Sequence, residues 1–160
     1  MKALSASEQA VVLSVVAEHK SRPGPLIEIL RAVQASLGFV PAAAVPLIAQ
    51  GLNLSRAEVH GVVTFYHFFR DQPAGRHIVR LCQAESCKAM GADALAGHAK
   101  KRLGIDFHET TANGDISLEP VYCLGNCACS PALMIDSDDL RGRVTAQGFD
   151  EIVTALGHRT

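Results

Sequence analysis

The chain has little excess charge of either sign and no long apolar run. Its 160 residues carry 15 Lys and Arg against 16 Asp and Glu, a formal net charge of −1. Because proteins bind nucleic acid largely through cationic side chains at the phosphates, this balance argues against a nucleic-acid partner. No apolar run approaches the roughly 20 residues that a membrane-spanning helix needs. We therefore expect no direct membrane insertion.

Several motifs of catalysis and redox chemistry are also missing. The sequence shows no Ser/His/Asp set, no Gly-rich phosphate loop and no paired carboxylates, so the chain alone does not look like a catalyst. It lacks the Cys-x-x-Cys of a dithiol oxidoreductase. Polar residues interrupt the N-terminal apolar stretch, which predicts neither a signal peptide nor an anchor. We expect a cytoplasmic protein, where paired cysteines bind metal more often than they form disulfides.

What is present indicates a folded protein in two parts. Hydrophobic residues make up 48% of the chain and charged residues 19%, which is typical of a globular protein. Pro73 and Gly75 mark a boundary at which the hydrophobic periodicity changes. The expected architecture is α+β: a small helical bundle over residues 1–75, followed by a thioredoxin-like α/β domain over residues 76–160.

Four short helices are expected in residues 1–75. Ser7 is the expected cap of the first helix, and Pro25 suits the first turn of the second. The strongest signal begins the fourth helix, where Ser55 is followed three residues later by Glu58. This spacing predicts a capping box, in which each residue bonds to the backbone of the other.

Residues 76–160 alternate between strand-like and helix-like patterns. The expected elements are a strand over 77–81 that delivers Cys82, a helix over 91–103, an extended segment over 107–111, a turn at Asn113-Gly114, strands over 116–122 and 132–136, a hairpin arm turning near Arg141-Gly142, and a helix over 149–157. This order places both cysteine-containing loops at strand ends.

Four cysteines stand in two pairs, Cys82-x4-Cys87 and Cys123-x3-Cys127. Each iron of a [2Fe-2S] cluster is tetrahedral and takes two bridging sulfides, which leaves two positions per iron for protein thiolates. A pair within one loop can chelate one iron. Two such loops side by side would complete the coordination of the cluster.

The residues beside these pairs suit a cluster but leave alternatives open. Gly91 and Gly125 let the backbone approach the sulfides, while Ser86 and Asn126 can donate hydrogen bonds. A structural zinc site also uses four cysteines, although its pairs are usually Cys-x2-Cys. Two disulfides would need an oxidising compartment. Cys129 is either an alternative ligand or a small buried residue beside the site.

Half of the chain's eight aromatic residues lie close together, at Phe65, Tyr66, Phe68 and Phe69. We expect them to form the core that joins the helical part to the α/β part, because packing within one chain is the commoner use of such residues. A surface that binds a partner is the alternative.

The two cysteine motifs, with GVVTFYHFF before them and Leu124-Gly125 inside the second loop, resemble the small [2Fe-2S] subunit of the NADH-dehydrogenase module. That family includes subunits of respiratory complex I, of NAD-linked hydrogenases and of NAD-dependent formate dehydrogenases. Within it the chain most resembles the gamma subunit of the molybdenum-dependent formate dehydrogenase, through residues 24–41, 52–70 and 81–95.

The resemblance implies a site and a role. Cys82, Cys87, Cys123 and Cys127 would ligate the [2Fe-2S] cluster, and Cys129 would not. The chain would be a non-catalytic electron-transfer subunit of an enzyme that converts formate and NAD+ to CO2 and NADH. Implied partners are a flavin- and NAD-binding beta subunit, with FMN and further iron-sulfur clusters, and a large alpha subunit with the molybdenum cofactor. Residues 1–75 would dock to these partners.

Two other functions remain as alternatives. The first is the equivalent [2Fe-2S] subunit of respiratory complex I or of an NAD-linked hydrogenase. The second, from a different class, is an iron-sulfur-sensing DNA-binding regulator, whose recognition helix would begin at Ser55. That helix would want several basic residues, but Arg56 is the only one between Leu52 and Phe69.

Overall fold

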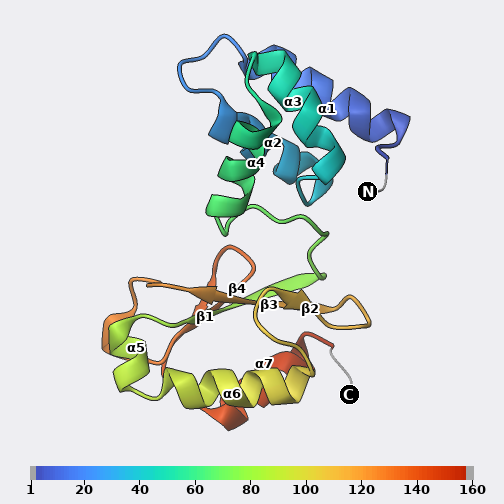
Figure 1. Cartoon of the computed structure of the whole chain (residues 1–160). Coiled ribbons are helices and arrows are strands. Elements are labelled where there is room, and N and C mark those ends of the chain that lie inside the picture. The colour runs from blue at the N-terminus through green and yellow to red at the C-terminus, as the bar shows by residue number, and fades with distance from the viewer. Residues whose placement is uncertain (1–2, 158–160) are drawn as a thin grey trace. The chain divides into compact units, whose positions relative to one another are not determined.

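The computed structural model describes residues 3–157, and within them the chain forms seven α-helices and a five-stranded sheet (Figure 1). The chain divides into two compact units, Met1–Pro73 and Ala74–Thr160. Each unit has its own hydrophobic core. Among the described residues, no helix is long and apolar enough to cross a membrane.

The first unit consists of helices packed around one apolar core. The helices are α1 (Ala6–His19), α2 (Leu26–Leu37), α3 (Val45–Leu52) and α4 (Arg56–Phe65), with a 3-10 turn at Ala42–Ala44 before α3. Val12, Ile29, Leu30, Ile48 and Val59 are fully buried, so every one of the four helices contributes to this core. Gly38 ends α2 in the left-handed conformation that glycine adopts without strain.

The helix caps confirm one sequence prediction and correct another. Ser55 caps α4 as expected: the Glu58 amide donates to its Oγ at 3.2 Å, and its own amide donates to the Glu58 carboxylate at 2.7 Å. The expected Ser7 cap of α1 is wrong, because Ser5 holds that place. Ser5 lies three residues before Glu8 and completes the same reciprocal box, which Ser7 is too close to Glu8 to form.

The expectation that the aromatic residues form core is also wrong for three of the four. Phe65, Tyr66 and Phe68 are 74%, 43% and 59% exposed, and only Phe69 packs against the helical core. Helix α4 buries its valines and ends at Phe65, so the aromatic rings lie at and beyond its last turn. There they contact one another edge to face, with ring centroids 5.1 to 6.2 Å apart.

The second unit is an α/β structure. Its elements are β1 (His77–Cys82), α5 (Glu85–Ala89), α6 (Ala92–Leu103), β2 (Glu109–Thr110), β3 (Ile116–Val121), a 3-10 turn (Cys127–Cys129), β4 (Leu133–Ile135), β5 (Asp139–Arg141) and α7 (Ala146–Ala155). The strand order is β2-β3-β1-β4-β5. Only β1 and β3 pair in parallel, while the other neighbours are antiparallel. The predicted strand that delivers Cys82 is therefore confirmed.

Helices α6 and α7 cover one face of the sheet (Figure 1). Val79 and Leu81 of β1 alternate with residues of the opposite face, as the period of two requires. Together with Ile116 and Leu118 of β3 they pack against α6 and against Phe149 of α7, which is fully buried. This packing fixes the position of the central strands whose ends carry the cysteine loops.

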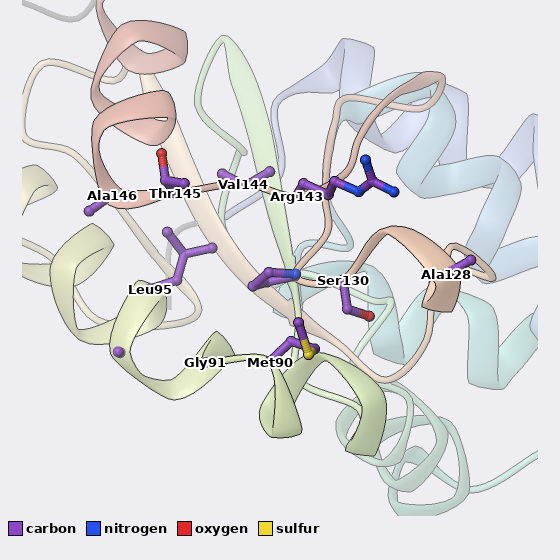
Figure 2. Close-up of a pocket in the computed structure, with 11 residues that line it drawn as sticks. Met90, Gly91, Leu95, Ala128, Ser130, Arg143, Val144, Thr145 and Ala146 are labelled. Atoms are coloured by element: carbon purple, nitrogen blue, oxygen red, sulfur yellow. The ribbon is translucent and has the colours of Figure 1, made fainter.

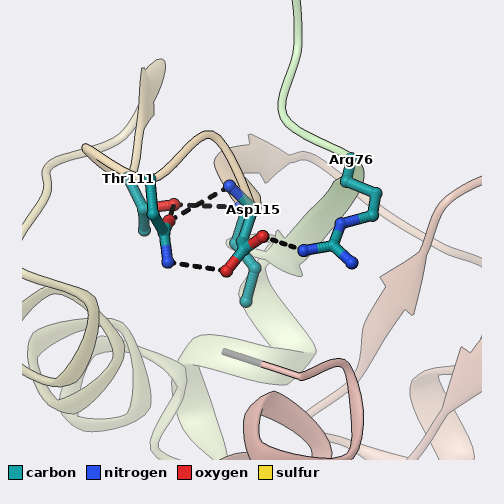
Figure 3. Close-up of polar contacts among 5 residues, drawn as sticks. Arg76, Thr111 and Asp115 are labelled. Atoms are coloured by element: carbon teal, nitrogen blue, oxygen red, sulfur yellow. Dashed lines mark hydrogen bonds and ion pairs between the residues drawn. The ribbon is translucent and has the colours of Figure 1, made fainter. Parts of the chain in front are cut away.

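Two turns set the edges of the sheet. At the expected Asn113-Gly114 turn, Asn113 bridges the Thr111 hydroxyl and the Asp115 carboxylate, which also pairs with Arg76 (Figure 3). The expected hairpin turn near Arg141-Gly142 is wrong, since the β4–β5 hairpin turns over residues 136–138.

Asp136 explains the position of that hairpin turn. Its carboxylate accepts the Ile78 amide at 2.9 Å and contacts the His77 ring at 2.9 Å, which ties the turn to the start of β1. Burial alone would raise the pKa of Asp136, but these two hydrogen bonds outweigh burial and lower it. Likewise α7 begins at Ala146, earlier than expected, because Thr145 caps it.

The close contact of α1 with α3 gives a direct test of the helical packing. A methyl group at Gly51 would lie 2.4 Å from Cγ1 of Val16, a stiff β-branched side chain. We expect Gly51→Ala to destabilise this unit by about 1–3 kcal/mol through overpacking. Amide hydrogen exchange in α1 and α3 of the full chain should then become faster.

The matched control is Gly61→Ala in α4, where a methyl group meets no atom within 4 Å. There the gain in helix propensity, about 0.8–1 kcal/mol, should slow exchange or leave it unchanged. Equal exchange in the two variants would contradict the close packing of α1 on α3.

Candidate metal centre

The parallel pairing of β1 with β3 brings the two cysteine loops to one edge of the sheet. In the register of these strands Cys82 lies opposite Val121, and Cys123 follows only two residues later. The Gln83 amide continues the ladder by donating to the Val121 carbonyl at 2.7 Å. On the other side the Cys82 amide donates to the Ala132 carbonyl at 3.0 Å. Backbone hydrogen bonds thus hold Cys82 between the segments that flank the second loop.

The first pair, Cys82 and Cys87, is buried in a small apolar cluster with Ala92 and Ala132. The two side chains hydrogen-bond to each other, and burial is the main reason that the pKa of Cys82 is raised. Burial also opposes ionisation of Cys87, but hydrogen bonds from the Ser130 hydroxyl, from Cys82 and from the Ala132 amide outweigh it and lower the pKa of Cys87. Cys87 is therefore the thiol of this pair that releases its proton first.

The second pair, Cys123 and Cys127, is exposed. Cys123 adopts a φ of 117°, and the Gly125 amide donates to its Sγ at 3.4 Å. The pKa of Cys127 is raised, first by its hydrogen bond with Cys123 and by charge on Cys123, and further by charge on Cys87 and Cys82. Thiolates of both loops would therefore repel one another, as four anionic ligands do without their metal.

Two contacts join the loops at the level of the sulfurs. The amide of Leu124, in the second loop, hydrogen-bonds to Cys82 and lowers its pKa against the effect of burial. The hydroxyl of Ser130, just after the second loop, lies 3.4 Å from Cys87 Sγ and 2.9 Å from the Cys127 carbonyl oxygen. Each loop therefore contributes hydrogen bonds to the other.

The donor set consists of two thiol pairs rather than one compact group. Among residues 3–157, no three or more His, Cys, Asp or Glu side chains form a group that could hold a single metal ion. A [2Fe-2S] cluster instead needs two thiolates at each of two irons. Two pairs of free cysteines, buried on one side and supplied with amide and hydroxyl donors, have the chemistry that this cluster requires.

Comparison with known proteins supports the same cofactor. The model of the thioredoxin-like [2Fe-2S] ferredoxin family matches residues 12–157. The chain belongs to this family.

Relatives within the family are similar over almost the whole chain. A subunit of the NADH-quinone oxidoreductase of Pseudomonas aeruginosa is 40% identical over 95% of this chain and 91% of the relative. The subunit of the same name in Escherichia coli is 34% identical over 94% and 90%. The HndA subunit of the NADP-reducing hydrogenase of Solidesulfovibrio fructosivorans is 30% identical over 84% and 78%.

A solved structure shares the fold. An NAD+-reducing [NiFe]-hydrogenase in the H2-reduced state superimposes with a TM-score of 0.65 at 21% sequence identity, over 82% of this chain. This chain spans only 22% of that hydrogenase chain. The chain is thus an electron-transfer ferredoxin homologous to oxidoreductase subunits.

Other residues singled out in the sequence lie around this ferredoxin site. Ser86 donates toward the Cys127 carbonyl oxygen at 3.3 Å rather than to a sulfur. Gly91 begins α6 with a φ of 94°, and Gly125 has a φ of 74°. Cys129 is half-buried, and its carbonyl accepts the Arg143 amide at 2.6 Å.

Sequence reasoning missed two residues of the ferredoxin site, Ser130 and Gly142. Ser130 acts on Cys87, which is 43 positions away in sequence, so no local pattern could have identified it. Gly142 packs so closely on the second loop that a methyl group there would lie 2.6 Å from Cys129 Cβ and 2.8 Å from Asn126 Nδ2. A glycine beside the mis-predicted hairpin turn was the one available signal for it.

We expect Gly142→Ala to displace the second cysteine loop. Overpacking of this kind costs typically 1–3 kcal/mol, so the melting temperature of the unit that contains the sheet should fall. Differential scanning calorimetry of the full chain measures it. Gly97→Ala, on the exposed face of α6 with no atom within 4 Å of the new methyl group, is the matched control and should not lower that temperature. Equal melting of both variants would show that the loop does not rest on Gly142.

Proposed function

We propose that Cys82, Cys87, Cys123 and Cys127 ligate a [2Fe-2S] cluster, and that the chain passes single electrons between this cluster and a flavin-bearing partner. The observation that carries the proposal is the joining of the two cysteine loops, by the Leu124 amide and the Ser130 hydroxyl, at one edge of the sheet. Cys129 stays outside the ligand set, beside Gly142.

The residues of the site have separate tasks. A [2Fe-2S] cluster, when bound, supplies one-electron redox chemistry. The four thiols give up their protons on binding metal, and the lowered pKa of Cys87 makes this step easiest there. Burial of the first pair limits access of water. The amides of Leu124, Ala132 and Gly125 donate toward sulfurs and stabilise negative charge on them.

For the parent enzyme we favour an NADH-quinone oxidoreductase of the respiratory complex I type. The similarity to the Pseudomonas aeruginosa subunit over almost the whole chain supports it, and HndA supports an NAD-linked hydrogenase as the close variant. In either complex the partner would be a flavin- and NAD-binding subunit with FMN and further iron-sulfur clusters. The chain itself would not catalyse the overall reaction.

A soluble formate dehydrogenase is the second candidate. It rests on the resemblance of residues 24–41, 52–70 and 81–95 to the gamma subunit of that enzyme. The partners would then include a large alpha subunit with the molybdenum cofactor. The relatives found by comparison favour complex I or a hydrogenase over this candidate.

We assign partner docking to the helical unit. Three aromatic side chains, Phe65, Tyr66 and Phe68, are exposed together at the end of α4. Contiguous exposed apolar side chains are typical of surfaces that bind another protein. Edge-to-face contacts order these rings in the free chain, which lowers the entropy that binding would cost.

The parent complex can be identified by purification from native cells through a tag on this chain. We expect a co-purifying flavoprotein, and NADH oxidation with an artificial electron acceptor. Quinone reduction, hydrogen-dependent or formate-dependent NAD+ reduction would then assign the complex to one of the three types. An eluate that contains the chain without any flavoprotein would contradict the proposed partnership.

The ligand assignment is tested by single substitutions in the full chain. Cys82→Ser and Cys123→Ser should each lose or markedly alter the visible absorption of the cluster, with a matching loss of bound iron and sulfide, because each removes one thiolate from an iron. Cys129→Ala is the matched control and should keep both. An unchanged spectrum would remove the substituted residue from the ligand set, and bleaching in Cys129→Ala would add Cys129 to it.

A further inference from the structure

Ser130 places a hydroxyl group between the two cysteine loops. Its side chain is only 7% exposed, and its Oγ has three polar neighbours: Cys87 Sγ at 3.4 Å, the Cys127 carbonyl oxygen at 2.9 Å and Ser86 Oγ at 3.1 Å. Ser130 lines a cavity of about 640 Å³ with Met90 and Gly91 on one side and Ala128 on the other (Figure 2). It is therefore the point at which both loops meet one hydroxyl group.

The number of available protons decides where this hydroxyl donates. A serine hydroxyl has one proton to give, and a carbonyl oxygen can only accept. While Cys87 is a thiol, Cys87 can donate to Ser130 and Ser130 can donate to the Cys127 carbonyl. Once Cys87 is a thiolate, it can only accept, so the single proton of Ser130 must serve either the sulfur or the carbonyl.

Ser86 resolves this competition. Its hydroxyl lies 3.3 Å from the same Cys127 carbonyl oxygen and can donate to it when Ser130 does not. Both acceptors are then satisfied only when Ser86 donates to the carbonyl and Ser130 donates to Cys87 Sγ. The charged sulfur is also the stronger acceptor of the two, since hydrogen bonds to ionised groups are about twice as strong as neutral ones.

We propose that Ser130 is a positioning residue that donates its hydroxyl proton to the ligating sulfur of Cys87 and thereby raises the reduction potential of the cluster. This inference rests on the proposed function, because it requires Cys87 to be a ligand. An added electron increases the negative charge on the ligating sulfurs, so a donor to Cys87 stabilises the reduced state more than the oxidised one. The lowering of the pKa of Cys87 by Ser130 has the same electrostatic origin.

The test is a redox titration of the purified full chain, followed by electron paramagnetic resonance. Ser130→Ala should shift the equilibrium against the reduced cluster by roughly three- to tenfold, which is about 30 to 60 mV toward negative potential at 59 mV per tenfold for one electron. Ser130→Thr keeps the hydroxyl and should restore the wild-type potential.

Ser86→Ala is the matched control. It removes a hydroxyl from the same network, but one that contacts the Cys127 carbonyl and not a sulfur, so its potential should stay close to the wild-type value. A wild-type potential in Ser130→Ala, or an equal shift in Ser86→Ala, would overturn the role of Ser130.

Two further outcomes separate this inference from the proposed function. If Ser130→Ala assembles no cluster, Ser130→Cys replaces it: its thiol is a weaker donor, so a potential below the wild-type value is expected and an unchanged one overturns the role of Ser130. A wild-type chain that binds no iron would overturn the proposed function itself. A wild-type cluster with a potential insensitive to residue 130 would leave the proposed function intact and reject only this inference.

Discussion

The parallel pairing of β1 with β3 is the constraint on which the site depends. Parallel neighbours end at the same edge of a sheet, so two loops that are far apart in sequence begin side by side. The register that sets Cys82 against Val121 fixes the first cysteine of each loop within two residues of the same level. Packing of Val79, Leu81, Ile116 and Leu118 against α6 and α7 holds that register, because a slip by one residue would turn their side chains away from the core.

The loops are then held by short-range contacts that the sheet alone does not supply. Gly142 lets the β5 segment approach Cys129 and Asn126 closely, while Leu124 and Ser130 reach the sulfurs of the first loop. The raised pKa values of Cys82 and Cys127 mean that the site without metal keeps protons that metal ions must displace. The same donors that help Cys87 to ionise also stabilise charge on the site after an electron arrives.

Local signals in the sequence predicted much of this architecture, while long-range contacts escaped it. The Ser55–Glu58 box and the strand that ends at Cys82 depend on neighbouring residues and were found. The β4–β5 turn was misplaced because Asp136 is fixed by His77 and Ile78, almost 60 positions earlier. Ser130 was missed for the same reason. The aromatic residues were expected in a core, and hydrophobicity alone could not show that α4 ends before it can bury them.

The most direct test of the account is to measure what the two cysteine pairs hold. Mössbauer spectroscopy of the full chain produced with iron-57, with iron and acid-labile sulfide determined on the same sample, reports the number of irons and their coordination. The account predicts two irons and two sulfides per chain, with each iron in tetrahedral sulfur coordination. One zinc ion per chain without sulfide, or a single iron bound by four thiolates, would contradict it.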